Sequence, residues 1–180
     1  EMAMKITKST LLAEKRFREK ETELVFIEQV EAEMTSAVEI QIKDEKRIIN
    51  FKGYIDRIDK IGSKYRVIDY KTGKVTDKDV EFKVSEDGIK ASFASSKHSL
   101  QLALYSIFFK EKYKVLPDIA AIYSLVNLTK PFELKFKNKN GLEDFPELFK
   151  ELVEEIISEI YDLDVPFEHS SNSKYCNFCN

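Results

Sequence analysis

Residues 53–73 read GYIDRIDKIGSKYRVIDYKTG and contain two runs of strand-forming residues joined by Gly62-Ser63. Glycine accepts the positive φ angle at the first position of a two-residue hairpin loop, so the stretch predicts a β-hairpin. With the loop centred on Gly62-Ser63, facing residues have numbers that add to 125, which sets Asp56 opposite Asp69.

The two opposed aspartates need a cation near them. Facing side chains on neighbouring strands have Cβ atoms about 4.5–5.5 Å apart, a separation at which two carboxylates repel each other. Lys71 shares a face with Asp69, because side chains two apart on a strand point the same way. The same register places Asp59 opposite Arg66 on the other face, where we expect an exposed ion pair.

Two carboxylates that converge from neighbouring strands also predict a metal site. Mg²⁺ commonly takes one or two carboxylates and completes its octahedron with water and phosphate oxygens. The competing interpretation is a surface hairpin with alternating charges and no metal.

Hydrophobic periodicity predicts the elements on either side of the hairpin. The predicted helices cover residues 9–20, 96–113 and 144–162. The predicted strands cover residues 38–42, 48–59, 65–71, 119–126 and 132–136, with a turn at 44–46. Residues 24–33 fit either a helix or a strand, and residues 74–93 predict a long, partly mobile loop.

The order of these elements predicts the fold class. Helix, three strands, helix, two strands and helix indicate an α/β or α+β fold with a mixed sheet flanked by helices. The helix residues expected to face the sheet are Leu11, Leu12, Phe17, Leu100, Leu104, Ile107, Phe108, Leu148, Leu152, Ile156 and Ile160.

Length and composition predict one ordered globular domain covering residues 1–180. Apolar residues make up 43% of the 180 positions and charged residues 34%, which fits a well-buried core under a highly charged surface. No stretch approaches the roughly 18 uninterrupted apolar residues of a membrane span, and residues 1–10 lack the apolar region of a secretion signal. We therefore expect a cytoplasmic protein with no membrane partner.

The net charge of −3 is unevenly distributed. Residues 60–98 hold nine Lys or Arg against six acids, whereas residues 142–168 hold ten acids against a single lysine. This favours the middle of the chain for contact with a polyanion such as DNA; a solvated surface is the alternative explanation.

Three motifs give these residues a family context. Residues 53–59 match a G-x-x-D-R-x-D pattern, residues 69–73 match D-Y-K-T-G, and Gln101 and Tyr105 form a Q-x-x-x-Y pair on one helix face. In this order, they resemble the PD-(D/E)XK nuclease superfamily, in particular its RecB-like, Cas4-related branch. The nuclease domains of AddB-type helicase–nucleases are the nearest in pattern. The resemblance implies a restriction-endonuclease-like αβββαβ core.

The resemblance also implies roles for the residues of the hairpin. Asp56, Asp69 and the backbone carbonyl of Tyr70 would bind Mg²⁺ or Mn²⁺, and Lys71 would contact the attacking water or the scissile phosphate. The implied activity is a metal-dependent exodeoxyribonuclease. Its implied setting is a helicase–nuclease of double-strand-break repair and recombination, with DNA as substrate and a helicase domain or subunit as partner.

The helix after the hairpin carries the remaining implied site residues. Gln101 would reach toward the metal site or the DNA backbone, and Tyr105 would support the strand. Lys97 and His98, just before the predicted helix, are further candidates for phosphate contacts, with solvated side chains as the alternative.

The chain departs from the family pattern in two places. Many members carry a metal-binding histidine before the first strand, but this chain has only His98 and His169; Glu31 or Glu33 is a candidate substitute. Some members hold a [4Fe–4S] cluster through one upstream cysteine and a group near the C-terminus. Cys176 and Cys179 match the start of that group, so a cluster is expected only in a longer parent protein, of which this chain would be a C-terminal part.

These departures leave other functions open. One is a nuclease-fold module that binds DNA or a partner subunit and lacks catalysis. Another is a nuclease that acts on RNA, although no sequence feature indicates recognition of a 2′-hydroxyl.

Overall fold

The fold was determined as a computed structural model that describes residues 2–42, 45–83, 92, 97–137, 141–164 and 166. The described elements are the helices α1 (Met2–Arg18), α3 (Lys97–Tyr113) and α4 (Phe145–Ile160), the short 3₁₀ helices η1 (Asp77–Val80) and η2 (Gly141–Glu143), and the strands β1 (Val25–Ile42), β2 (Glu45–Ile61), β3 (Lys64–Lys71), β4 (Glu81–Phe82), β5 (Ile119–Ser124), β6 (Asn127–Glu133) and β7 (Lys135–Phe136).

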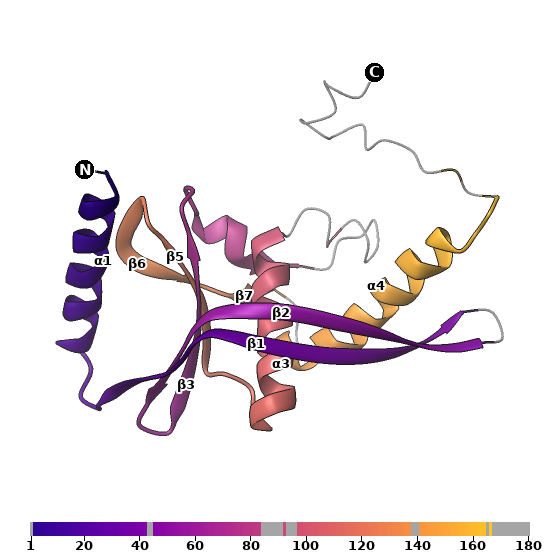
Figure 1. Ribbon diagram of the computed structural model, residues 1–180, viewed down its shortest axis with the longest axis horizontal. Helices are drawn as coiled ribbons and strands as arrows, with labels where there is room; N and C mark the ends of the chain where they lie inside the picture. Colours follow the sequence, from indigo (N-terminus) through magenta and orange to yellow (C-terminus); the bar gives the residue numbers. More distant parts are fainter. Residues whose placement is uncertain are drawn as a thin grey trace, which may run out of the picture.

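The main sheet has five strands in the order β1-β2-β3-β5-β6. All neighbours are antiparallel except β3 and β5, which pair in parallel. A parallel pair needs a long crossover connection, and here that crossover contains α3. The predicted mixed sheet flanked by helices is therefore confirmed, with α1 beside β5 and β6 and the helices α3 and α4 packed near β1 and β2 (Figure 1).

Strands β1 and β2 form a long antiparallel ribbon that extends past the rest of the sheet, with α4 alongside it (Figure 1). The ribbon resolves the ambiguous segment at residues 24–33, most of which belongs to β1. Alternate β1 residues are buried toward the helices, among them Ala32, Met34, Ile40 and Ile42. A strand is favoured here because β2 supplies a continuous hydrogen-bonding partner.

The apolar core lies between the sheet and helices α3 and α4. Its largest cluster includes Ile58 and Val67 from the hairpin and Phe108 and Phe109 from α3. From α4 it takes Phe149 and its neighbours, whereas Ile156 and Ile160 of the predicted apolar side are exposed. The prediction for α4 was therefore wrong in its last turns, which lie beyond the part of the helix that packs on the sheet.

Helix α1 does not pack on the sheet through the leucines of its predicted apolar side. Leu11 and Leu12 are 65% and 47% exposed, so the predicted apolar side was wrong for both. Instead, Ala13 is buried, Glu14 pairs with an arginine of β2, and the ring of Phe17 lies under an arginine of β3. A helix that docks through ion pairs and a cation–π contact has no apolar stripe for periodicity to find.

The segment predicted as a loop at residues 74–93 is ordered in its first part. It contains η1 and β4, and Val75, Val80 and Phe82 are fully or nearly fully buried. Periodicity misses these elements because each is only two to four residues long. Residues 84–91 and 93–96 lie outside the described part of the chain.

Across the described ranges, no helix has both the length and the apolar character that crossing a bilayer requires.

Candidate active site

The hairpin between β2 and β3 has the register that the sequence predicts. Five pairs are formed, from Ile61 opposite Lys64 to Arg57 opposite Ile68, and all have numbers that add to 125. The turn residue Gly62 has a φ angle of 56°, the left-handed conformation that favours glycine. The register therefore brings both motif strands side by side.

Asp69 is the most buried member of the predicted site. Its Oδ2 atom lies 2.7 Å from Nζ of Lys71, with side-chain exposures of 4% and 26% respectively. Its Oδ1 atom accepts a hydrogen bond from Nε2 of Gln101 at 3.2 Å. Burial raises the pKa of Asp69, and Lys71 opposes this rise only in part. The carboxylate is held in a setting that favours a neighbouring cation.

Asp56 reaches the same place from β2. Its Oδ2 atom accepts a hydrogen bond from the backbone N–H of Tyr70 at 2.7 Å. The negative charge of Asp56 is also one of the causes that raise the pKa of Asp69. The structure thus brings Asp56, Asp69 and Lys71 together around the backbone of Tyr70.

Gln101 and Tyr105 form the wall of the site on α3. Nε2 of Gln101 donates to the phenolic oxygen of Tyr105 at 2.7 Å as well as to Asp69. Tyr105 is 9% exposed, and burial raises the pKa of its hydroxyl. The hydroxyl of Tyr105 thus orients the amide of Gln101 toward Asp69. Contact of either residue with nucleic acid stays a prediction.

A glycine lets this helix approach the hairpin closely. A Cβ atom on Gly53 would lie 3.1 Å from the ring of Phe108 and 3.4 Å from the ring of Tyr105. The first glycine of the G-x-x-D-R-x-D motif therefore sets the distance between β2 and α3.

His98 belongs to this region, although the sequence suggested a position before the helix. It lies in the first turn of α3, half-buried, and its Nδ1 atom is buried without a hydrogen-bond partner among the described residues. Burial and then the charge of Lys71 lower its pKa. A neutral imidazole therefore stands beside the charged residues of β3. Lys97, the first residue of α3, is exposed.

The residues present fit a divalent metal ion. Two carboxylates and a backbone carbonyl are hard oxygen ligands of the type that Mg²⁺ and Mn²⁺ prefer. Oδ2 of Asp69 is buried, and its partner among the described residues is the ammonium of Lys71, which a bound metal ion could replace. The described residues supply no group of three or more His, Cys, Asp or Glu side chains at this place, so water and phosphate oxygens would complete the coordination.

The candidate substitutes for the missing histidine do not join the site. Oε2 of Glu33 lies 2.9 Å from Nζ of Lys52 and accepts a hydrogen bond from Tyr54 at the exposed surface of the ribbon. Its contacts with Lys52 and Tyr54 lower the pKa of Glu33. Glu31 is also exposed. Cys176 and Cys179 lie outside the described residues.

The opposite face of the hairpin holds a buried charge network, which the sequence analysis missed. Asp59 and Arg66 are 0% and 1% exposed, so the prediction of an exposed pair was wrong. Oδ2 of Asp59 accepts from Nη2 of Arg66 at 2.5 Å, and Oδ1 accepts from Nε of Arg57 at 2.6 Å. Alternation along β2 and β3 does predict that these residues share a face, but it cannot predict that helix α1 covers them.

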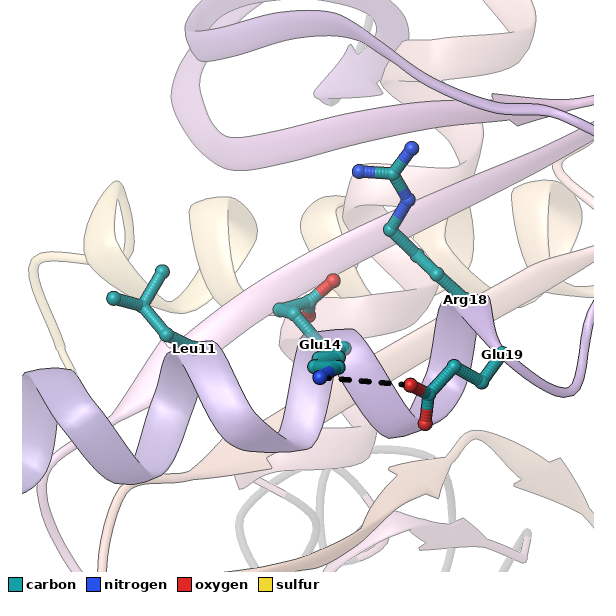
Figure 2. Close-up of a pocket in the computed structure, with 5 residues that line it drawn as sticks. Leu11, Glu14, Arg18 and Glu19 are labelled. Carbon is teal, nitrogen blue, oxygen red and sulfur yellow. Dashed lines mark ion pairs between the residues drawn. The ribbon is translucent and has the colours of Figure 1, made fainter.

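Helix α1 closes this network. Oε2 of Glu14 accepts a hydrogen bond from Nη2 of Arg57 at 3.0 Å, and the ring of Phe17 lies 3.9 Å from the guanidinium carbon of Arg66. Glu14 and Arg18 project from the same side of α1, away from Glu19 (Figure 2). The hairpin therefore carries the candidate metal site on one face and its attachment to α1 on the other.

Comparison with known families agrees with this geometry. The family model of the PD-(D/E)XK nuclease superfamily matches residues 2–180. The chain belongs to the PD-(D/E)XK nuclease superfamily. The paired acids and the lysine two residues after the second acid are the residues that name this superfamily, whose members are typically metal-dependent nucleases. The fold, a five-stranded mixed sheet with helices, is of the restriction-endonuclease-like type.

Other comparisons add little to the family assignment. The crystal structure of SSO0001 matches 80% of this PD-(D/E)XK chain at 18% sequence identity, with a TM-score of 0.35. This chain spans 55% of the SSO0001 chain. A search of curated proteins gave no match.

Proposed function

We propose that this chain is the catalytic domain of a Mg²⁺- or Mn²⁺-dependent DNA nuclease that hydrolyses phosphodiester bonds. The observation that carries the proposal is the convergence of Asp56, Asp69 and Lys71 around the backbone of Tyr70. A buried carboxylate with a raised pKa, beside a second acid and a lysine, suits divalent cations and phosphate groups together.

The proposed roles follow from the chemistry of each group. Asp56, Asp69 and the carbonyl of Tyr70 would hold the metal ion. A bound ion would polarise a phosphoryl oxygen and lower the pKa of its bound water. Lys71, whose side chain is partly exposed, would orient the attacking water or stabilise the charge that develops on the scissile phosphate. Gln101 would hold Asp69 in orientation through its amide.

Hydrolysis of labelled DNA tests this function directly. The purified chain, incubated with Mg²⁺ or Mn²⁺, should degrade an end-labelled duplex and an end-labelled single strand. Asp69→Ala should abolish the activity, and Lys71→Ala should reduce it by at least about 100-fold. Equal activity in the wild type and both variants would show that the cleavage comes from another protein or another site.

We place the domain in the RecB-like branch, on the strength of the three sequence motifs and the contact between Gln101 and Asp69. In this proposal it is an exonuclease domain of a larger helicase–nuclease that acts in double-strand-break repair, and any [4Fe–4S] cluster belongs to that parent protein. An exonuclease should degrade linear DNA and leave covalently closed circles intact. Cleavage of the circles would contradict the exonuclease assignment.

A second function is favoured by one observation. Lys71 already neutralises Asp69, and no third acidic, histidine or cysteine ligand gathers in the described part of the chain. A nuclease fold of this kind can bind DNA or a partner subunit without catalysis. Calorimetric titration with Mn²⁺ separates the two: uptake that is lost in Asp56→Asn supports the enzyme, and DNA binding without metal uptake supports the module.

A further inference from the structure

We propose that the phenol of Tyr70 and the guanidinium of Arg57 form a positioning pair that holds the metal-binding backbone from the opposite face of the hairpin. This inference rests on the proposed nuclease function. It assigns a role to the central residue of the Asp69-Tyr70-Lys71 sequence through its side chain, in addition to the backbone carbonyl already considered.

Tyr70 makes contacts on both faces of the hairpin, through its backbone on one and its side chain on the other. Its backbone N–H donates to Oδ2 of Asp56 at 2.7 Å, within the candidate site. Its side chain projects to the other face, where the phenolic oxygen accepts a hydrogen bond from Nη1 of Arg57 at 3.1 Å. Because Asp69 and Lys71 are its two neighbours in the chain, a rotation of Tyr70 about the strand would move all three residues together.

Arg57 is a fixed anchor for that phenol. Its Nε atom donates to Asp59 at 2.6 Å, and its Nη2 atom donates to Glu14 of α1 at 3.0 Å. Burial alone would lower the pKa of Arg57, but the hydrogen bond and charge of Asp59 outweigh it and raise the pKa. The guanidinium therefore stays charged, and its planar fork offers fixed donor directions to three partners.

The phenol has little freedom to find other partners. Burial raises the pKa of Tyr70, with the charge of Arg57 opposing the rise, so the hydroxyl is neutral at physiological pH. Its ring lies 5.9 Å from the ring of Tyr123 on β5, which restricts its movement within the layer between sheet and α1. Tyr70 thus links the docking of α1 to the orientation of the site.

Metal sites depend on such outer contacts. Groups that orient the direct ligands typically change metal affinity or activity by about 10- to 100-fold when they are removed. Loss of the phenolic oxygen would remove neither carboxylate nor Lys71, but it would remove one restraint on the orientation of the Tyr70 backbone. We therefore expect weaker metal binding and a lower kcat, with little change in KM for DNA.

Tyr123 provides a matched control. Its phenolic oxygen also accepts a hydrogen bond from a buried arginine, Nη1 of Arg66, at 3.1 Å. Burial raises the pKa of Tyr123 as it does that of Tyr70. Tyr123 lies on β5 directly beside Tyr70, but its chain neighbours carry no proposed metal ligand. Loss of either hydroxyl should therefore lower the stability of the fold by a similar amount. Only the loss of the Tyr70 hydroxyl should weaken metal binding.

The experiment compares Tyr70→Phe with Tyr123→Phe in the full chain. Mn²⁺ affinity is measured by calorimetry, cleavage of labelled DNA by kinetics, and folding by thermal melting followed by circular dichroism. We expect similar melting temperatures for the two variants, and a Kd for Mn²⁺ that rises about tenfold in Tyr70→Phe only. Equal Mn²⁺ affinity in the two variants, with an active wild type, overturns this inference and leaves the nuclease function standing.

An inactive wild type and an unfolded Tyr70→Phe variant are the two other possible outcomes. A wild type that neither binds Mn²⁺ nor cleaves DNA overturns the proposed function and this inference with it. If Tyr70→Phe does not fold, Glu14→Gln removes the charge opposite Arg57 and leaves the phenol intact. We expect Glu14→Gln to weaken Mn²⁺ binding in the same direction by a smaller factor, and an unchanged affinity there overturns the inference.

Discussion

Nζ of Lys71 lies 2.7 Å from Oδ2 of Asp69, two residues earlier on the same strand. The ammonium and a divalent ion compete for the charge of Asp69, because Oδ2 faces Lys71 and Oδ1 already accepts a hydrogen bond from Nε2 of Gln101. Lys71 therefore acts as the counter-ion of Asp69 in the metal-free protein. We expect a bound ion to displace it and so release the ammonium toward the phosphate.

Lys71→Ala should separate metal binding from catalysis. Removal of the competing ammonium should leave Mn²⁺ affinity equal to or tighter than that of the wild type. The rate of DNA cleavage should fall by about 10²- to 10³-fold, the usual effect of losing one group that stabilises transition-state charge. Calorimetry and single-turnover kinetics measure the two effects. Lys64→Ala is the control, since Lys64 is exposed at the other end of β3 and should change neither quantity.

Asp69→Asn should stabilise the metal-free protein at neutral pH. Burial raises the pKa of Asp69 in the folded state, so its charged form is disfavoured there relative to the unfolded chain. The advantage of asparagine should therefore be full above the folded pKa and should disappear as pH falls through that pKa toward the usual aspartate value. Urea unfolding from pH 7 to pH 4 measures it. A variant less stable than the wild type throughout would contradict the sign.

Gly53→Ala should disturb the approach of α3 to the hairpin. Its Cβ would meet the rings of Phe108 and Tyr105 at 3.1 and 3.4 Å, so we expect a loss of about 1–3 kcal/mol, as in other overpacked cores. Urea unfolding gives the loss, and the displaced Tyr105 should also weaken Mn²⁺ binding through Gln101. Gly73→Ala is the control: apart from Gly73 itself and its chain neighbours, no atom of the described residues lies within 4 Å of the Cβ position. It should alter stability by less than about 0.5 kcal/mol.

Asp59→Ala should be among the most destabilising substitutions of the hairpin. It leaves the buried guanidinium groups of Arg57 and Arg66 without their shared carboxylate, for which about 3–5 kcal/mol is expected. Glu39→Ala, which breaks an exposed pair with Lys46, should change stability far less, because exposed ion pairs contribute little. Similar values for both variants in urea unfolding would contradict the burial of the network.

Local patterns predicted the hairpin because they depend on few residues. The glycine turn sets the register, and strict alternation along the strands then decides which side chains share a face. The same rules placed Asp56 and Asp69 on neighbouring strands with Lys71 beside them. They failed for Leu11 and Leu12, because the docking of α1 depends on arginines more than 40 residues away in the chain.

The sequence by itself determined the mixed fold, the register of the hairpin and the convergence of two acids and a lysine, since these follow from turn chemistry and strand periodicity. The family resemblance directed Gln101 toward the metal site or the DNA backbone, and the tertiary structure decided that its partner is Asp69. Only the tertiary structure decided that Asp59 and Arg66 are buried and that Tyr70 is held by Arg57. Each of these depends on which helix covers which face of the sheet. Burial then decides whether a charge is a solvated surface group or part of a fixed network.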